Sequence, residues 1–277
     1  MYKEMDHLYK RRILSVSVPR FIWASVVGAL ESPPLASGRI VGGSNVDISK
    51  YPYQVSLLND GYHYCGASVV AAQWALTAGH CCNGYDVLSL SIRGGSSTNN
   101  QGGVLFTVEK LVLHPSYDSV NLNFDVCMIQ IKETFLGHPN IAIIPLSNSD
   151  SIPSNELGTV SGWGATQSDG ETVLQLRATK VKIFTDKSCT AATRNYVSLT
   201  SSMFCAGNVG SSICVGDSGG PLVYNQQQIG VVSFIVLECG GVAPAVYTRI
   251  ANRTVRDFIL QQINSSKMIK TTPKRKG

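Results

Sequence analysis

The sequence predicts an all-β protein that ends in a single helix. After Arg39, short runs of β-branched and aromatic residues are separated by Gly, Asn, Ser and Pro, and the 277 residues include 26 glycines. Hydrophobic residues make up 44% and charged residues 15% of the chain, which is typical of a packed globular protein and not of a disordered or coiled-coil one. Short strands bounded by turns at such intervals indicate a β-sandwich or a β-barrel.

Seven segments have the composition of strands, and a loop over 148–155 divides them near the middle of the chain. The expected strands are 53–58, 67–70, 87–92, 126–131, 175–183, 228–233 and 245–250. A helical rhythm is clear only at the end, where Ala251, Val255, Phe258, Ile259 and Ile263 recur at the 3.6-residue spacing of an amphipathic helix. Length and composition alone leave one domain or two open.

Both ends of the chain differ from its body. Residues 1–39 read as a signal peptide and pro-segment, because basic residues precede an apolar stretch over 21–30 that ends before a Pro-Pro break. Ten apolar residues are about half of what a membrane-spanning helix needs, so we expect a secreted protein with no membrane span. Residues 267–277 form a basic tail with five Lys or Arg.

The net charge of +5 comes from these ends. Residues 40–266 carry 12 basic and 15 acidic side chains, so the body is mildly acidic. It contains no basic stripe with interleaved aromatic residues, and this argues against nucleic acid as a partner.

Eight cysteines spread along the chain fit an oxidising compartment. Zinc is the competing interpretation, but Cys81 and Cys82 are adjacent and neither a repeated Cys-x2-Cys knuckle nor a His-Glu-x2-His run occurs. We therefore expect disulfides and no metal. Eight cysteines allow 105 pairings, and the sequence alone does not choose among them.

The sharpest local signal is the segment 216–221, Gly-Asp-Ser-Gly-Gly-Pro. A nucleophilic serine needs an exposed hydroxyl and backbone amides that are free to point at a developing oxyanion, and glycines around it permit the required turn. We expect Ser218 to be the nucleophile and the amides of Gly216 and Ser218 to form the oxyanion hole. A plain glycine-rich turn is the alternative.

A serine nucleophile needs a base, and that base needs a carboxylate to orient it. Among the five histidines, His80 follows an apolar strand and precedes Cys81, which would anchor its loop. Asp125 stands at the mouth of another apolar strand, where an aspartate is otherwise a turn or cap residue. We expect His63, His114 and His138 to be surface or loop residues.

Together these motifs resemble the chymotrypsin family of serine proteases, in the order His, Asp, Ser, over about residues 40–264. Further matching pieces are Ile-Val-Gly-Gly at 40–43, Ser-Gly-Trp-Gly at 161–164, Met-Phe-Cys-Ala-Gly at 203–207 and Val-Tyr-Thr-Arg at 246–249. The resemblance implies two six-stranded antiparallel β-barrels, roughly 40–147 and 156–250, with the site between them and a carboxy-terminal helix, in a protease domain over 40–266.

The resemblance also implies activation by cleavage and a set of disulfides. Cleavage after Arg39 by a trypsin-like protease would free the α-amino group of Ile40, which would pair with Asp217 and order the oxyanion hole. The implied bridges are Cys65–Cys81, Cys189–Cys205 and Cys214–Cys239. A calcium site is not expected, because no carboxylate lies between Asp86 and Glu109, where related enzymes place ligands.

Cys82 and Cys127 fall outside the family set. Each lies two residues beyond a member of the expected triad, and His80 and Asp125 must meet, so we expect Cys82 and Cys127 to form a fourth bridge that ties the catalytic segments together. Two buried free thiols are the alternative.

The resemblance also points to the specificity pocket. Ser212 takes the floor position, so a buried Arg or Lys would lack a counter-charge. The expected substrate-binding residues are Ser212, Ile213, Ser233, Phe234, Ile235 and Ala245. Because the isoleucines and the alanine would narrow the cavity, we expect elastase-like cleavage after small aliphatic residues. The alternatives are a chymotrypsin-like preference for Leu or aromatic residues, and side chains that fill the pocket and leave almost no activity.

Two functions from different classes follow. The first is an active secreted endopeptidase, a monomer that needs no cofactor and whose partners are protein or peptide substrates, an activating protease and protein protease inhibitors. The second is a catalytically silent secreted homologue that binds a partner through the same surface. An intact triad favours the first, and the chain order His, Asp, Ser argues against a lipase-type esterase.

Overall fold

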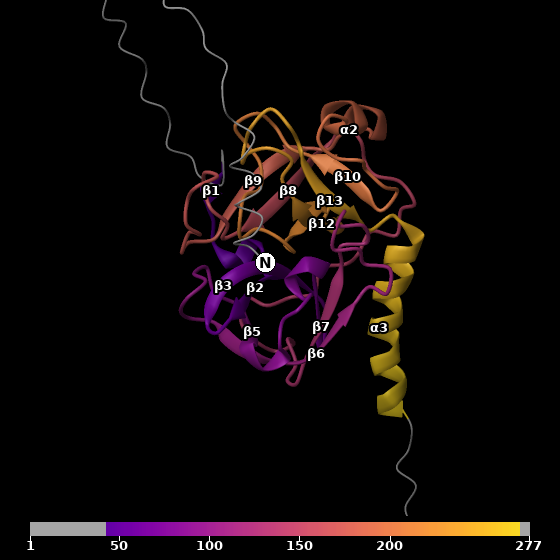
Figure 1. Ribbon diagram of the computed structural model, residues 1–277. Coiled ribbons are helices and arrows are strands. Elements are labelled where there is room, and N and C mark those ends of the chain that lie inside the picture. Colours follow the sequence, from indigo (N-terminus) through magenta and orange to yellow (C-terminus); the bar gives the residue numbers. More distant parts are fainter. Residues whose placement is uncertain (1–42, 272–277) are drawn as a thin grey trace, which may run out of the picture. The chain divides into compact units, whose positions relative to one another are not determined.

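The computed structural model describes residues 43–271 and the side chains of residues up to 265. Its first half is a closed antiparallel barrel of six strands in the order β2-β3-β4-β7-β6-β5 (Figure 1). The strands are β2 (Gln54–Asn59), β3 (Tyr62–Ala71), β4 (Trp74–Thr77), β5 (Leu90–Gly94), β6 (Val104–Leu113) and β7 (Cys127–Ile131). Alternate apolar side chains such as Leu57, Leu76 and Ile92 fill its interior and are completely buried.

The second half is a sheet in the order β1-β9-β8-β11-β12-β13-β10. Its strands are β1 (Ser44–Asn45), β8 (Leu157–Gly162), β9 (Arg177–Lys182), β10 (Met203–Ala206), β11 (Pro221–Tyr224), β12 (Gln227–Phe234) and β13 (Ala245–Arg249). A bridge between Ile183 and Ala206 joins the end of β9 to β10 and closes a ring of six strands. The two-barrel prediction is therefore confirmed, and β1 adds a seventh strand to the outside of β9.

Two short elements differ from the expected pattern. Residues 87–89, expected as the start of a strand, form a 3-10 turn, η3 (Val87–Ser89), because the side chain of Asp86 accepts a hydrogen bond from the amide of Leu88 (3.0 Å). The helix α2 (Asp186–Thr193) was not predicted, since its residues are mostly polar and lack an apolar stripe. Thr185 caps it, and Cys189 anchors it to β10 through a disulfide with Cys205.

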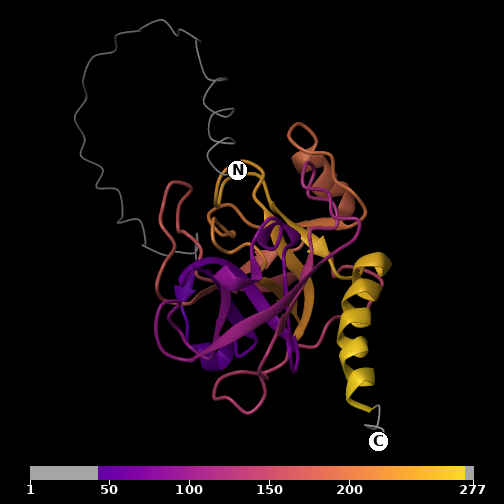
Figure 2. The same cartoon turned by 60° about the horizontal axis from the view of Figure 1, so that its bottom comes forward.

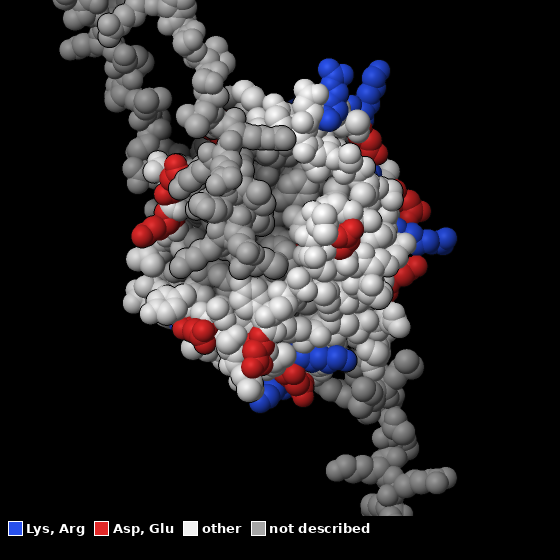
Figure 3. All heavy atoms as spheres, viewed as in Figure 1, with Lys and Arg blue, Asp and Glu red and all other residues white. Residues whose placement is uncertain are grey.

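The predicted terminal helix is confirmed as α3 (Arg253–Thr271), whose apolar stripe of Val255, Phe258 and Ile259 joins the core of the first barrel. In both ribbon views α3 lies along one side of the protein and extends past that barrel (Figure 2). Among residues 43–271, no helix combines the length and apolar character needed to cross a membrane. On the described part of the face in Figure 3, Lys and Arg lie at the margins and form no stripe.

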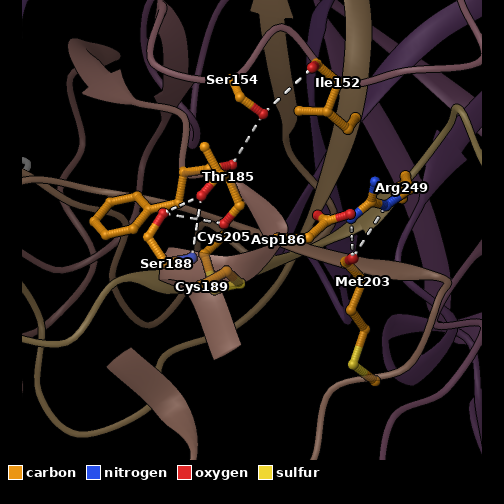
Figure 4. A network of polar contacts seen from close by, with 10 residues as sticks. Ile152, Ser154, Thr185, Asp186, Ser188, Cys189, Met203, Cys205 and Arg249 are labelled. Carbon is orange, nitrogen blue, oxygen red and sulfur yellow. Dashed lines mark hydrogen bonds and ion pairs between the residues drawn. A yellow bond between two sulfur atoms is a disulfide. The ribbon is translucent and has the colours of Figure 1, made fainter. Parts of the chain in front are cut away.

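Arg249 at the end of β13 joins α2 to the second barrel (Figure 4). Its Nε and Nη2 atoms both donate to the carbonyl of Met203 (3.1 and 2.9 Å), and Nη2 also pairs with Asp186. We expect Arg249→Ala to lower the unfolding free energy by about 1–3 kcal/mol, because the carbonyl loses a charged donor. Asp186 is 72% exposed, so Asp186→Asn should cost less than about 1 kcal/mol. Urea unfolding of both variants measures the two losses of unfolding free energy. Equal losses would contradict the view that Arg249 acts mainly through the Met203 carbonyl.

Candidate active site

His80 and Asp125 meet at the open end of the first barrel. His80 lies in η2 (Gly79–Cys81), the 3-10 turn that follows β4, and Asp125 precedes β7, which pairs with β4. His80 Nδ1 lies 2.8 Å from Asp125 Oδ2, and the His80 amide donates to Asp125 Oδ1 at 2.8 Å. A β-carbon on Gly79 would lie 3.1 Å from Oδ1, so glycine at this position lets the carboxylate approach. The carboxylate fixes both the orientation and the tautomer of the imidazole.

Two groups from the second barrel complete the surroundings of Asp125, which is fully buried. The hydroxyl of Ser233 donates to Oδ2 at 2.5 Å, and the hydroxyl of Thr248 donates to the Asp125 carbonyl at 2.7 Å. Ser233, expected as a substrate-binding residue, thus turns its side chain to the carboxylate. Thr248 was not foreseen as part of the site, since a hydroxyl that contacts a residue 123 positions earlier leaves no local pattern.

The backbone before Asp125 is strained. Leu122 and Phe124 have φ angles of 56° and 51°, and each such non-glycine residue costs about 1–3 kcal/mol. Neighbouring groups hold the turn in place: the Phe124 ring stacks on His114 at 4.8 Å, and the Phe124 amide donates to Ser202 Oγ at 3.2 Å. Strained backbone of this kind persists where several neighbouring contacts hold it in place, and it is common at active sites.

Ser218 lies on the loop between β10 and β11, beside the His80 segment. Its carbonyl accepts a hydrogen bond from Gly66 (2.7 Å), next to Cys65, and Cys65 is bonded to Cys81. A β-carbon on Gly219, whose φ is +79°, would lie 2.0 Å from Thr77 Oγ1, so only glycine permits this approach to β4. Within residues 43–271, the Ser218 hydroxyl makes no hydrogen bond to the His80 ring. Such bonds often tighten only when substrate binds.

The amides expected to form the oxyanion hole are those of Gly216 and Ser218. Among the described residues, the amides of Gly216 and Ser218 donate to no acceptor. Gly216 has a φ of +93°, a conformation that favours glycine, and Asp217 stands between the two donors. Asp217 is buried, and its carboxylate accepts hydrogen bonds from Gly164 (2.8 Å) and Cys214 (2.9 Å). Burial raises the pKa of Asp217 to about 6, and these two bonds offset the rise only in part.

The prediction that His63 is a surface or loop residue was wrong, and His114, which does lie in a loop after β6, is buried. His114 is 2% exposed and packs between Phe124 and Phe258. His63 lies at the start of β3, where its Nε2 donates to the carbonyl of Gly216 (3.0 Å) and its Nδ1 accepts from Ser56 (2.7 Å). Since 153 residues separate His63 from Gly216, no local signal could have revealed this contact.

The stability of the protein should depend on His63 below pH 6.5. Burial lowers the pKa of His63 to about 4, so the unfolded chain binds a proton that the folded one rejects between these values. Stability is therefore lost as the pH falls from 6.5 to 4, by about 2 kcal/mol once the partial exposure of the ring is allowed for. Urea unfolding of the native chain and of His63→Gln at several pH values measures this loss of unfolding free energy. The part that comes from His63 should be absent in the variant. Parallel pH profiles would contradict it.

A family profile described as Trypsin matches residues 40–259. The chain belongs to the trypsin family of serine proteases. It is 40% identical to trypsin 5G1 of Aedes aegypti over 230 residues, which cover 81% of this chain and 85% of that one. It is also 34% identical to hypodermin-B of Hypoderma lineatum over 255 residues, covering 91% of this chain and 98% of that one.

The solved structures agree with this trypsin-family fold. The structure of the scabies mite inactivated protease paralogue S-D1 superposes with a TM-score of 0.73 at 27% identity, and the match covers 82% of this chain and 97% of the other. As a member of the trypsin family, the protein is a serine endopeptidase.

The eight cysteines of this trypsin-family chain form four disulfides: Cys65–Cys81, Cys82–Cys127, Cys189–Cys205 and Cys214–Cys239. The group of Cys65, His80 and Cys81 could hold a metal by proximity alone, but both sulfurs are already bonded to each other. On the chain-entropy view, the loop of Cys65–Cys81 is worth about 3 kcal/mol and the longer one of Cys82–Cys127 about 4 kcal/mol. The fourth bridge, which lies outside the expected family set, thus closes the largest loop.

The residues expected to form the specificity pocket lie in the second barrel, mostly buried and in two hydrophobic clusters. Ser212, Ile213 and Ala245 are 4%, 2% and 1% exposed. Ile213 and Ala245 belong to one hydrophobic cluster with Tyr247, and Ile235 packs against it. Phe234 is half-buried beside the cluster of Met203, Cys205 and Val246. The residues predicted for the base of the pocket, Ser212, Ile213 and Ala245, are therefore buried and uncharged.

Tyr247, a fully buried member of this cluster, was not singled out from the sequence. Its hydroxyl is buried without a hydrogen-bond partner among the described residues, and burial together with the Asp217 carboxylate raises the pKa of Tyr247. A buried hydroxyl without a partner is costly. Ile213, in the same cluster, offers it no polar atom. Arg39 and Ile40, the expected activation residues, lie outside the described residues.

Proposed function

We propose that this protein is a secreted serine endopeptidase in which Ser218 is the nucleophile, His80 the general base and Asp125 the orienting carboxylate. The observation that carries the proposal is the pair of 2.8 Å contacts between His80 and the buried Asp125, beside a serine loop in which two amides donate to no acceptor among the described residues. Serine is a weak nucleophile until a neighbouring base takes its proton, and the Asp125 carboxylate holds that base in the required tautomer.

The reaction would follow the acyl-transfer course of the family. The Ser218 oxygen attacks the scissile carbonyl carbon while its proton passes to His80 Nε2, and the amides of Gly216 and Ser218 stabilise the oxyanion. When the peptide C–N bond breaks, His80 gives this proton to the leaving amine and an ester remains on Ser218. Water, deprotonated by His80, then attacks the ester, and its proton returns to the serine as the carboxylic acid leaves.

We propose cleavage after small aliphatic residues. Ser212 supplies no negative charge, and the buried Ile213, Ala245 and neighbouring Ile235 narrow the base of the pocket. One methylene in such a pocket changes kcat/KM by about 10–200-fold. Peptides with Ala or Val before the scissile bond should therefore have a higher kcat/KM than peptides with Leu or Phe there. A preference for Leu or Phe is the outcome that would replace this assignment.

We propose that the protein is made as a precursor that is cleaved after Arg39. The buried carboxylate of Asp217 has two amide donors but no cationic partner among residues 43–271, and an ion buried without its partner is strongly destabilising. The α-ammonium of Ile40, released by a trypsin-like protease, would supply that charge. Four disulfides and the basic, apolar start of the sequence support passage through an oxidising secretory route.

The test is covalent labelling of the activated protein, beginning at Ile40, with a fluorophosphonate probe. We expect labelling at Ser218, confirmed by peptide mass, with loss of at least about 10³-fold in labelling rate in Ser218→Ala, since no other serine has this base. Ser211→Ala, which lies outside the proposed triad, is the matched control. No labelling of the native protein would make it a silent homologue, as the scabies mite paralogue is described to be.

A further inference from the structure

We propose that the Cys82–Cys127 disulfide is a positioning element of the active site, which holds the Asp125 carboxylate against His80. This inference rests on the proposed function, because it assigns the bridge a role in the triad beyond stability. The bridge joins the residue two positions after His80 to the residue two positions after Asp125. Both cysteines are buried, at 5% and 0% exposure.

The bridge lies next to the hydrogen-bonded pairing of β4 with β7. Cys82 caps the 3-10 turn η2, which follows β4, and Cys127 begins β7, opposite Thr77 at the end of β4. The last β4–β7 pair and the disulfide therefore close a small ring, and His80 belongs to this ring. Asp125 is attached to it two residues before Cys127.

Apart from the bonds between His80 and Asp125, the two triad segments have different anchors. The His80 turn is fixed to the first barrel through Cys65–Cys81. The Asp125 turn contacts the first barrel through the stacking of Phe124 on His114, and the second through the hydroxyls of Thr248 and Ser233 and the bond from Phe124 to Ser202. Among the described residues, the Cys82–Cys127 bridge is the covalent link that joins these two catalytic segments directly.

The strain in the Asp125 turn gives this link a function. Leu122 and Phe124 have left-handed φ angles, and the Val126 amide donates to the Phe124 carbonyl (2.8 Å) across Asp125. A strained turn that loses one anchor relaxes towards ordinary backbone angles. Because Asp125 lies in this turn, such relaxation would move its carboxylate away from the His80 ring.

Misalignment of the Asp125 carboxylate with the His80 ring should lower the catalytic rate and leave substrate binding unchanged. The apolar residues predicted for the pocket, Ile213, Ile235 and Ala245, belong to a hydrophobic cluster of the second barrel that does not include Cys82 or Cys127, and Cys214–Cys239 bridges the segments that carry them. A displacement of about 1 Å in a catalytic group costs about 100-fold in rate. We therefore expect lower kcat with unchanged KM when this disulfide is removed.

The experiment compares two double variants of the activated protein, Cys82→Ala/Cys127→Ala and Cys189→Ala/Cys205→Ala. The second removes a buried bridge between α2 and β10, away from the triad, and is the matched control. Active sites are titrated so that kcat is expressed per competent site, below the unfolding temperature of both variants. We expect kcat to fall about 10- to 100-fold with KM within about 2-fold in the first, and kcat to stay within about 2-fold in the control.

Two further measurements keep the inference falsifiable. Cys82→Ala/Cys127→Val restores buried volume and replaces the first variant where that one fails to fold. Proton NMR of the downfield His80 Nδ1 resonance reports the bond to Asp125 directly, and we expect it to broaden or shift in the variants that lack this bridge and to stay unchanged in the control. If the variants without the bridge keep the native kcat per site and the native His80 resonance, the disulfide is a structural link and does not position the triad. Failure of the proposed function is a separate outcome, the absence of fluorophosphonate labelling in the native protein.

Discussion

Replacing Asp125 with Asn is expected to lower kcat by about 10³-fold or more, the contribution of a well-oriented general base. In the native site both carboxylate oxygens accept from His80, and Oδ2 also accepts from Ser233. An amide offers one acceptor and one donor in the same space, so its nitrogen would face a donor and favour the wrong tautomer of the imidazole. Steady-state kinetics with one peptide substrate, in the activated protein, measure the loss.

Asp257→Asn provides the control for this change, because Asp257 is an exposed residue of α3 far from β7 in the sequence. It should keep native kcat and KM. Thermal unfolding of both variants separates a catalytic effect from a failure to fold. Native activity in Asp125→Asn would remove Asp125 from the triad and leave the His80 contact as a structural one.

Replacing Ile213 with Ser is expected to turn the protein towards larger substrates. The change removes a branched side chain that is 2% exposed at the base of the pocket. It also introduces a hydroxyl into the hydrophobic cluster that contains Tyr247, whose own hydroxyl has no partner among the described residues. For peptides that differ only in the residue before the scissile bond, the ratio of kcat/KM for Leu to that for Ala should rise about 100-fold.

Ile183→Ala controls for this result, since Ile183 belongs to the same hydrophobic cluster but lies outside the predicted pocket. It should cost about 2–5 kcal/mol of stability and leave the Leu to Ala ratio unchanged. A ratio that stays native in Ile213→Ser would show that another wall of the pocket, such as Ile235, sets its size.

Local patterns predicted the parts of this fold that local physics determines. Short apolar runs between turn residues marked β2, β7 and β12, which are buried along almost their whole length, and the 3.6-residue rhythm marked α3, which buries one stripe. The helix α2 was missed because its residues are mostly polar, and its stability depends on the Thr185 cap and the Cys189–Cys205 bridge. The strand β1 was missed because two residues are too short to show a period.

In the candidate site, too, the sequence predicted the residues with a local pattern and missed those that depend on contacts between distant segments. The glycine pattern around Ser218 and the setting of His80 are local, and the reasoning that placed Cys82 beside Cys127 needed only the requirement that His80 and Asp125 meet. Thr248, His63 and Tyr247 escaped because their roles arise from contacts between segments that lie more than 100 residues apart, or from the burial of one hydroxyl. Such contacts depend on tertiary packing and leave no mark on neighbouring residues.

The pairing of Ser44 and Asn45 with β9, together with the bond from Arg177 to the Gly43 carbonyl, fastens the chain just three residues after the proposed new terminus. A freed Ile40 amine would then search a sphere of only about 10 Å, the extended length of three residues. So short a tether gives a local concentration of the amine in the millimolar range or above. Onset of activity after cleavage should therefore be first order and independent of how dilute the protein is.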